Sequence, residues 1–225
     1  DKRSLGYNSV RLQPRCKLEN CIESDSYSIR CYAYTHSTFP KIPTNIKKWY
    51  TTNCDITEAT PIPFGLYPGG EYNFEKLSNI KKEDTVYINF QNYTKDRAEL
   101  KLNFRKYKNI PHINFVWDAS LPRDEFLKDI AKSKFVVCPE GNGLDSHRIW
   151  EVLYSGSIPV LLYDNWSYRL LEGLPVIFVH YWEQVLNLPW LVEQSKQLDF
   201  SQMHKLDLDY WNREFQQYVR DYSPE

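Results

Sequence analysis

Five ionisable side chains fall within positions 140–151, between two apolar segments. They are Glu140, Asp145, His147, Arg148 and Glu151. Carboxylates and histidine can serve as general acids or bases, and arginine binds phosphate through two parallel hydrogen bonds. So much charge between two apolar segments predicts a binding or catalytic site.

The loop before this predicted helix has the features of an anion site. Gly141 and Gly143 allow a ligand to approach the main chain closely. Asp145 or Ser146 is a suitable N-cap, and the free N–H groups and dipole of a helix start favour an anion. Arg148 falls in the first turn, where its charge opposes the dipole but suits a phosphate. The pattern therefore favours phosphate binding.

Glu151 follows Arg148 by three positions, so the two side chains share one face of the predicted helix. One turn deeper than the phosphate, its carboxylate would accept hydrogen bonds from ribose hydroxyls. The alternative is an ordinary capped helix with an Arg148–Glu151 surface pair worth about 0.3 kcal/mol. The segment lacks the Lys-Ser/Thr of a P-loop and the GxGxxG order of a dinucleotide site, which disfavours both classes.

From residue 84 onward, strand and helix patterns alternate. Continuous apolar strands separated by helices indicate an α/β fold with a parallel sheet covered on both faces, a doubly wound layer. The predicted strands are 85–90, 112–117, 135–138, 158–162 and 175–179, and the predicted helical segments are 96–107, 123–133, 146–155, 169–171 and 182–191.

The rest of the chain is divided more simply. Residues 1–75 predict a small N-terminal lobe, with a strand at 28–34, a short helix at 43–49 and an extended segment at 60–66. Residues 76–202 form the main lobe. Residues 203–225 hold a long helix that we expect to pack across the lobes through an apolar stripe of Leu208, Trp211, Phe215, Tyr218 and Tyr222.

Bulk properties exclude some classes of protein. The net charge of −1 argues against binding nucleic acid through a basic field. No run of apolar residues is long enough for a transmembrane helix, and the N-terminal residues are too polar for a signal peptide. Because the chain begins at Asp1, we expect a trimmed N-terminus and leave a removed anchor open. Five loosely spaced cysteines favour reduced thiols and a cytoplasmic setting.

The segment PEGNGLDSHRIWEVLYSGSIPVLL (139–162) resembles the donor-binding segment of exostosin-like glycosyltransferases, glycosyltransferase family 47 with its short viral and microbial relatives. That family has a Pro-x-Gly-x-Gly-x-Asp loop, a His-Arg, a Trp-Glu-Ala-Leu helix and a Gly-x-Ile-Pro-Val strand. Three further stretches are similar to the short relatives: YTHS (34–37), KWY with NCD (48–55), and PIPFGL (61–66).

The resemblance implies a GT-B fold, in which two Rossmann-like lobes face each other across a cleft and the C-terminal lobe holds a nucleotide sugar. It implies that Arg148 meets the diphosphate and Glu151 the ribose. At the carboxyl end of the first strand of this lobe lie Asn89 and Arg97. Arg97 is either a second phosphate contact or a solvated member of a charged run. The remaining predicted donor-site residues are Gly141, Asn142, Gly143, Asp145, Ser146 and His147.

Family members of this kind invert the anomeric centre, which requires a general base and stabilisation of the leaving diphosphate. The candidate bases are His36, Glu140, Asp145 and Asp55, and the sequence does not choose among them. We expect no metal and no cofactor besides the donor, because the Asp-x-Asp match at 207–209 falls on the tail helix, where two acids do not converge on one ion.

The leading hypothesis is therefore an inverting, metal-independent transferase that moves a sugar from a nucleotide sugar to a glycan. The expected donor is a UDP-sugar, with UDP-xylose as the first candidate. One alternative is an enzyme similar to α1,3-fucosyltransferases that uses a GDP-sugar. The other is a non-catalytic module that binds a sugar or nucleotide, which the short N-terminal lobe makes conceivable.

Overall fold

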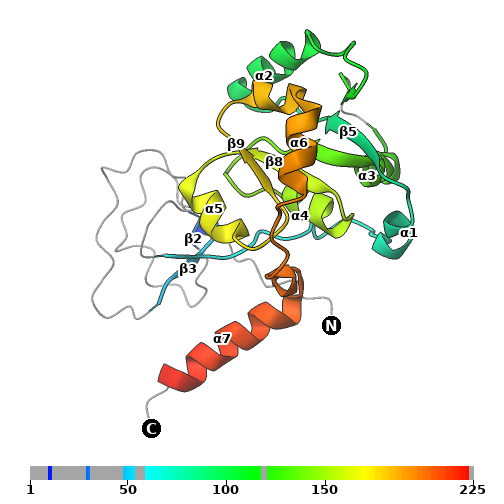
Figure 1. The fold of residues 1–225 in the computed structure, drawn as a ribbon. Helices are drawn as coiled ribbons and strands as arrows, with labels where there is room; N and C mark the ends of the chain where they lie inside the picture. The colour runs from blue at the N-terminus through cyan, green and yellow to red at the C-terminus, as the bar shows by residue number, and fades with distance from the viewer. Residues whose placement is uncertain (1–9, 12–28, 31–47, 54–58, 118–120, 223–225) are drawn as a thin grey trace.

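A computed structural model of the chain describes residues 10–11, 29–30, 48–53, 59–117 and 121–222. Its central feature is a five-stranded sheet in which all neighbouring strands are parallel (Figure 1). The strand order is β6-β5-β7-β8-β9, which confirms the predicted parallel sheet. These strands are β5 (Glu83–Ile88), β6 (Ile113–Phe115), β7 (Ser133–Val137), β8 (Ile158–Leu162) and β9 (Ile177–Val179).

Both faces of this sheet are covered by helices. Successive side chains of a strand point to opposite faces, so Val86 and Ile88 join one buried cluster while Tyr87 joins the other. One face carries α1 (Phe74–Ser78), α3 (Arg123–Lys132), α4 (His147–Tyr154) and α5 (Asn165–Leu171), and the other carries α2 (Lys95–Arg105), η2 (Trp182–Leu186) and α6 (Leu188–Ser195). The layer is doubly wound, as the alternating pattern predicts.

One predicted helix is interrupted. The segment predicted as a single helix over 182–191 divides into the 3₁₀ helix η2 and the α-helix α6. Asn187 accepts a hydrogen bond from the backbone N–H of Trp190, and Pro189 occupies the first turn of α6. An N-cap and an early proline start a new helix because proline has no N–H to continue the previous one.

The described N-terminal residues form short parallel pairs. β1 (Val10–Arg11) pairs with β2 (Ile29–Arg30), and β3 (Tyr50–Thr51) pairs with β4 (Thr60–Pro61). Arg169 of α5 donates a hydrogen bond to the carbonyl of Ala59. Most of the expected N-terminal lobe lies outside the described residues, so the two-lobed GT-B arrangement stays a prediction.

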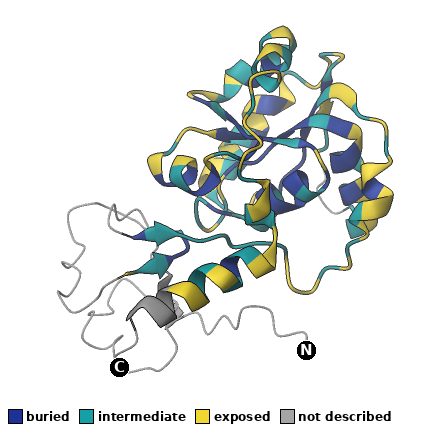
Figure 2. Cartoon of the chain, turned by 60° about the horizontal axis from the view of Figure 1, so that its bottom comes forward, coloured by how far each residue is buried: buried dark blue, intermediate teal, exposed yellow. Residues whose placement is uncertain are grey.

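The tail consists of η3 (Met203–Leu206) followed by α7 (Leu208–Tyr222). Phe215 on the predicted apolar stripe meets the ring of Tyr50 edge-on, with centroids 4.9 Å apart. Trp211 is buried, whereas Leu208 at the start of the stripe is 49% exposed. Figure 2 shows α7 beside β3 and β4, and buried residues concentrated in the sheet and the inner helix faces. Within the described ranges, no helix combines the length and apolar character needed to cross a membrane.

Lys82 joins three elements at the amino ends of the strands. Its Nζ donates to the carbonyls of Ala131 and Ser155 and to the hydroxyl of Ser157, at 2.8, 2.9 and 2.8 Å. Removing the ammonium leaves partly buried acceptors without a donor. We therefore expect Lys82→Ala to lower the free energy of unfolding by about 1–3 kcal/mol, as measured by urea denaturation.

The neighbouring Lys81 provides the control for this variant. It is exposed, and no described residue pairs with its ammonium. Lys81→Ala should change the free energy of unfolding by less than about 0.5 kcal/mol. Equal effects of the two substitutions would contradict the role assigned to Lys82.

Candidate functional site

A cavity of about 650 Å³ opens at the carboxyl ends of β5 and β7. The chain leaves β5 for β6 on one side and returns to β7 on the other, so the strand order reverses between these two strands. Ligands of doubly wound folds bind at such a reversal, because the loops diverge there and leave a crevice. The lining residues are Asn53, Phe64, Tyr67, Asn89, Gln91, Tyr93, Thr94, Arg97, Leu121, Arg123, Phe126, Gly141, Asn142, Gly143, Asp145, Ser146, His147, Arg148 and Glu151.

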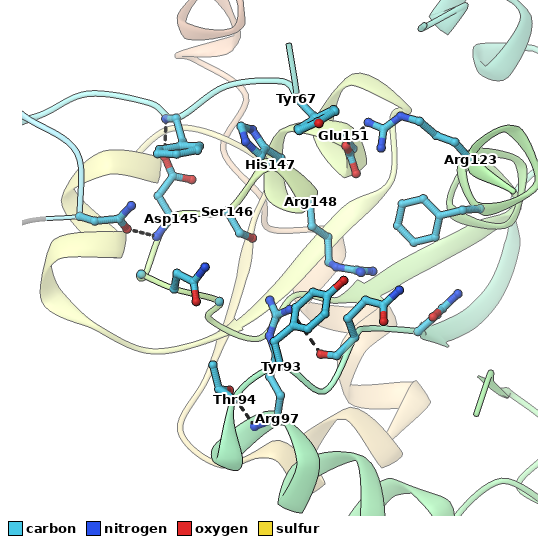
Figure 3. A pocket seen from close by; sticks show the side chains of 18 of the residues that line it. Tyr67, Tyr93, Thr94, Arg97, Arg123, Asp145, Ser146, His147, Arg148 and Glu151 are labelled. Atoms are coloured by element: carbon cyan, nitrogen blue, oxygen red, sulfur yellow. Dashed lines mark hydrogen bonds and ion pairs between the residues drawn. The ribbon is translucent and has the colours of Figure 1, made fainter. Parts of the chain in front are cut away.

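Arg148 extends from the first turn of α4 into this cavity (Figure 3). Its guanidinium lies over the ring of Phe126, with Cζ 4.9 Å from the ring centroid. Nη1 is buried and has no hydrogen-bond partner among the described residues. Burial lowers the pKa of this guanidinium. A buried charge without a partner costs free energy, so this position suits an anionic ligand that would supply the missing acceptor.

Arg97 brings a second positive charge to the same cavity. Its Nε donates to the carbonyl of Glu140 at 2.6 Å, and Nη2 donates to that of Pro139 at 2.9 Å. Burial first, and then the charge of Arg148, lower the pKa of Arg97 to about 10. The alternative that Arg97 is a solvated member of a charged run is therefore wrong. Arg97 fixes the loop after β7 and adds positive potential to the cavity.

The N-terminus of α4 adds a further polar donor. Ser146 has the extended backbone of an N-cap, but its hydroxyl makes no capping hydrogen bond. That hydroxyl is buried and has no partner among the described residues. Ser146 and Arg148 thus both line the cavity with unused donors, beside a helix start that itself favours negative charge.

Glu151 pairs with Arg123 rather than with Arg148. Oε1 of Glu151 is 2.5 Å from Nη2 of Arg123 and accepts a 3.2 Å hydrogen bond from the hydroxyl of Tyr72. Arg123 also donates to the Tyr72 hydroxyl. The alternative of an Arg148–Glu151 surface pair is wrong, since Glu151 is 4% exposed and its partner belongs to α3. Contacts from described residues fall on Oε1 and none on Oε2.

Asp145 connects an N-terminal segment to the loop at the carboxyl edge of the sheet. Its Oδ2 accepts from the backbone N–H of Phe64 at 2.5 Å, and its Oδ1 accepts from the indole N–H of Trp150 at 2.8 Å. The backbone N–H of Asp145 donates to the side chain of Asn53. Burial raises the pKa of the carboxyl to about 7, although the two N–H donors oppose this shift. Asp145 is therefore a buried connector that also lines the cavity.

His147 closes the same wall. Its Nδ1 lies 2.7 Å from the carbonyl oxygen of Gly65, and its ring contacts those of Phe64 and Tyr67, with centroids 4.5 and 5.5 Å away. The segment that the sequence assigns to the N-terminal lobe thus packs directly on α4, where it forms one side of the cavity.

The loop glycines permit two close approaches. A Cβ on Gly143 would lie 2.5 Å from Cγ of Asn53, and a Cβ on Gly141 would lie 3.2 Å from Nη2 of Arg97. Asn53 itself has a φ of +53°, which asparagine tolerates better than most residues. The absence of a Cβ at these positions therefore leaves room for the side chains of Asn53 and Arg97, in addition to the ligand approach that the sequence predicts.

The structure does not bring all predicted site residues together. Asn89 lines the cavity, where its Nδ2 donates to the hydroxyl of Tyr87 at 2.8 Å. Asn142 lines it as well. Glu140 lines a neighbouring hollow instead. His36 and Asp55 fall outside the described residues.

Sequence reasoning assigned no site role to Asn53, Tyr67, Tyr72, Arg123 or Phe126. The position of Arg123 could have been predicted, because it begins the helix after the strand predicted at 112–117. A helix that follows a parallel strand starts at the same edge as the predicted site. Asn53, Tyr67 and Tyr72 are distant in sequence, and only folding brings them to α4.

The Asp-x-Asp match makes a local turn. Oδ1 of Asp207 accepts a hydrogen bond from the backbone N–H of Asp209 at 2.9 Å, at the start of α7. Across the described part of the chain, no group of three or more His, Cys, Asp or Glu residues is arranged to hold a metal ion. Cys138, at the end of β7, is a buried free thiol.

Comparisons with known proteins support the resemblance found in the sequence. Residues 115–223 match the family described as "RXYLT1 C-terminal domain", and this match includes the loop and helix that carry Arg148. A stretch of 60 residues is 35% identical to "Probable glycosyltransferase At3g07620" of Arabidopsis thaliana. That stretch covers 27% of this chain and 12% of the plant protein.

The raised pKa of Asp145 predicts a pH dependence of stability. Between its ordinary value of 3.8 and about 7, the folded state binds more protons at this carboxyl than the unfolded state does. The stabilisation of the folded state by this carboxyl is therefore fully present below about pH 4 and is lost as pH rises to about 7. We expect wild type to lose more free energy of unfolding than Asp145→Asn between pH 5 and 8, by on the order of 2 kcal/mol. Identical pH profiles in urea denaturation would contradict this assignment.

Proposed function

We propose that this chain, which is similar in sequence to exostosin-like glycosyltransferases, transfers a sugar from a nucleotide sugar to a glycan acceptor. The observation that carries the proposal is the buried, unpartnered Nη1 of Arg148 in a cavity at the strand-order reversal. A diphosphate would supply its missing acceptor. Arg97 and the N-terminus of α4 would add further stabilisation of the same negative charge.

Glu151 suits the ribose of such a donor. Arg123 already neutralises the carboxylate, which removes much of the repulsion that a bare carboxylate would exert on a nearby phosphate. Oε1 is occupied by Arg123 and Tyr72, whereas Oε2 is left to accept hydrogen bonds from ligand hydroxyls. The role predicted for Glu151 therefore depends on Arg123, which orients it.

The proposed reaction is a single displacement without a metal. An oxygen of the acceptor attacks the anomeric carbon, the bond from that carbon to the diphosphate oxygen breaks, and the configuration inverts. A base takes the proton of the attacking hydroxyl, and the departing negative charge stays on the diphosphate beside Arg148 and Arg97. Asp145 lines the cavity and stays a candidate base, although each of its carboxylate oxygens already accepts a hydrogen bond from a described residue. His36 stays the candidate from the N-terminal part.

We propose a UDP-sugar as donor, with UDP-xylose first, because the matched family is an exostosin-like xylosyltransferase family. Thermal-shift measurements with UDP and GDP separate this proposal from a GDP-sugar transferase similar to fucosyltransferases. Turnover assays separate it from a non-catalytic binding module, which would bind the nucleotide sugar and release no nucleotide even with acceptor glycans present.

Arg148→Ala tests the site. The variant removes a charge-assisted contact to phosphate worth about 1.5–3 kcal/mol, so UDP should bind about 10- to 100-fold more weakly by isothermal titration calorimetry. Because Nη1 is buried without a hydrogen-bond partner among the described residues, its removal should leave the melting temperature of the unliganded protein unchanged or higher.

The control is Arg105→Ala. Arg105 lies outside the cavity, with Cζ 4.8 Å from the ring centroid of Trp117, and should have no effect on UDP affinity. Unchanged UDP binding by Arg148→Ala would refute the site assignment. A drop in the melting temperature of the unliganded variant would instead show that Arg148 serves the fold.

A further inference from the structure

A second cavity, of about 500 Å³, opens beside the first at the carboxyl ends of β7 and β8. Arg97 lines both cavities, and its hydrogen bonds to the carbonyls of Pro139 and Glu140 fix the loop between them. Gly141 and Gly143 line the first cavity, whereas Glu140 lines the second. The two hollows are therefore neighbours that share one wall.

The charge of the second cavity is opposite to that of the first. Four carboxylates line it, and they belong to Asp96, Glu99, Glu140 and Asp164. Among its described lining residues the one cation is Arg97, whose guanidinium donates to backbone carbonyls of the loop. The pKa of Glu140 is raised by burial and by the charges of Asp96 and Asp164. Such an environment repels phosphate and offers many acceptors to a ligand rich in hydroxyl groups.

Two further features point to a ligand of this kind. Ser167 is 3% exposed, and its hydroxyl, on the cavity wall, has no hydrogen-bond partner among the described residues. Two aromatic residues, Tyr163 and Trp182, are among those that line the cavity. The ring of Tyr163 is 49% exposed and sits 6.0 Å from that of Tyr168 and 5.8 Å from that of His180. An aromatic face beside hydrogen-bonding groups matches the apolar face and hydroxyl edge of a sugar ring.

We infer that this second cavity binds a neutral sugar of the acceptor glycan, with Tyr163 as the stacking platform and Asp164 and Ser167 as hydrogen-bonding partners. The inference rests on the proposed function, because an acceptor bound here lies next to the donor cavity across Arg97. A divalent cation fits less well, since no described group of three acidic or other metal-binding residues converges on one point. The charges of the two cavities then favour different substrates. The positive first cavity favours the diphosphate, and the acidic second cavity favours the neutral glycan.

The test uses the whole protein with UDP present and a panel of neutral disaccharides consisting of xylobiose, cellobiose and lactose. Saturation-transfer NMR identifies which of them bind, and titration gives their affinity. Tyr163→Ala should weaken disaccharide binding about 3- to 10-fold, because it removes one aromatic contact. Asp164→Asn should also weaken it, while preserving the N-cap of α5 that Asp164 forms with Trp166 and Ser167.

Phe200→Ala is the matched control. Phe200 is 58% exposed, but it lines a hollow at the amino ends of the strands, away from both cavities. It should leave disaccharide affinity unchanged, and all three variants should retain the UDP-induced thermal shift of wild type.

The possible outcomes distinguish failure of the proposed function from failure of the acceptor site. Failure of wild type to bind UDP would refute the proposed function. Normal UDP binding without binding of any panel disaccharide at millimolar concentration would refute the acceptor site alone. The acceptor site would also be refuted if Tyr163→Ala bound disaccharide as well as wild type, or if UDP displaced the disaccharide competitively.

Discussion

The buried Nη1 of Arg148, which has no hydrogen-bond partner among the described residues, is the constraint around which this edge of the molecule is organised. A buried charge is tolerated only where a partner, bound or built in, compensates it. Here the built-in carboxylate, Glu151, is turned toward Arg123 on α3. The positive potential of Arg148 therefore remains available, and Arg97 and the start of α4 increase it.

Several contacts that maintain this arrangement use backbone groups. Arg97 holds the loop after β7 through two carbonyls, and Asp145 holds Phe64 through its N–H. Such contacts fix the position of the loop without neutralising Arg148. They also divide the carboxyl edge of the sheet, so that the positive cavity and the acidic cavity lie on either side of one arginine.

The sequence predicts the elements of the main lobe because their signals are local. Continuous apolar strands separated by amphipathic helices require a covered parallel sheet, and β8 has the predicted bounds of 158–162. The short helix α1 was not predicted, since its single buried residue, Leu77, leaves no periodic pattern. The division between η2 and α6 depends on capping by Asn187 and on Pro189. The prediction of one helix over 182–191 followed the apolar pattern instead of these two signals.

The sequence by itself determined which residue types stand at the carboxyl edge: the loop glycines, Ser146, Arg148 and Glu151 follow one predicted strand in a spacing that suits a nucleotide diphosphate. Only the tertiary structure decided their partners. Three contacts join residues from separate elements. Glu151 pairs with Arg123, Arg97 donates a hydrogen bond to the loop after β7, and Phe64 donates one to Asp145. Spacing along one helix fixes which side chains share a face, whereas contacts between elements depend on how the sheet and helices pack.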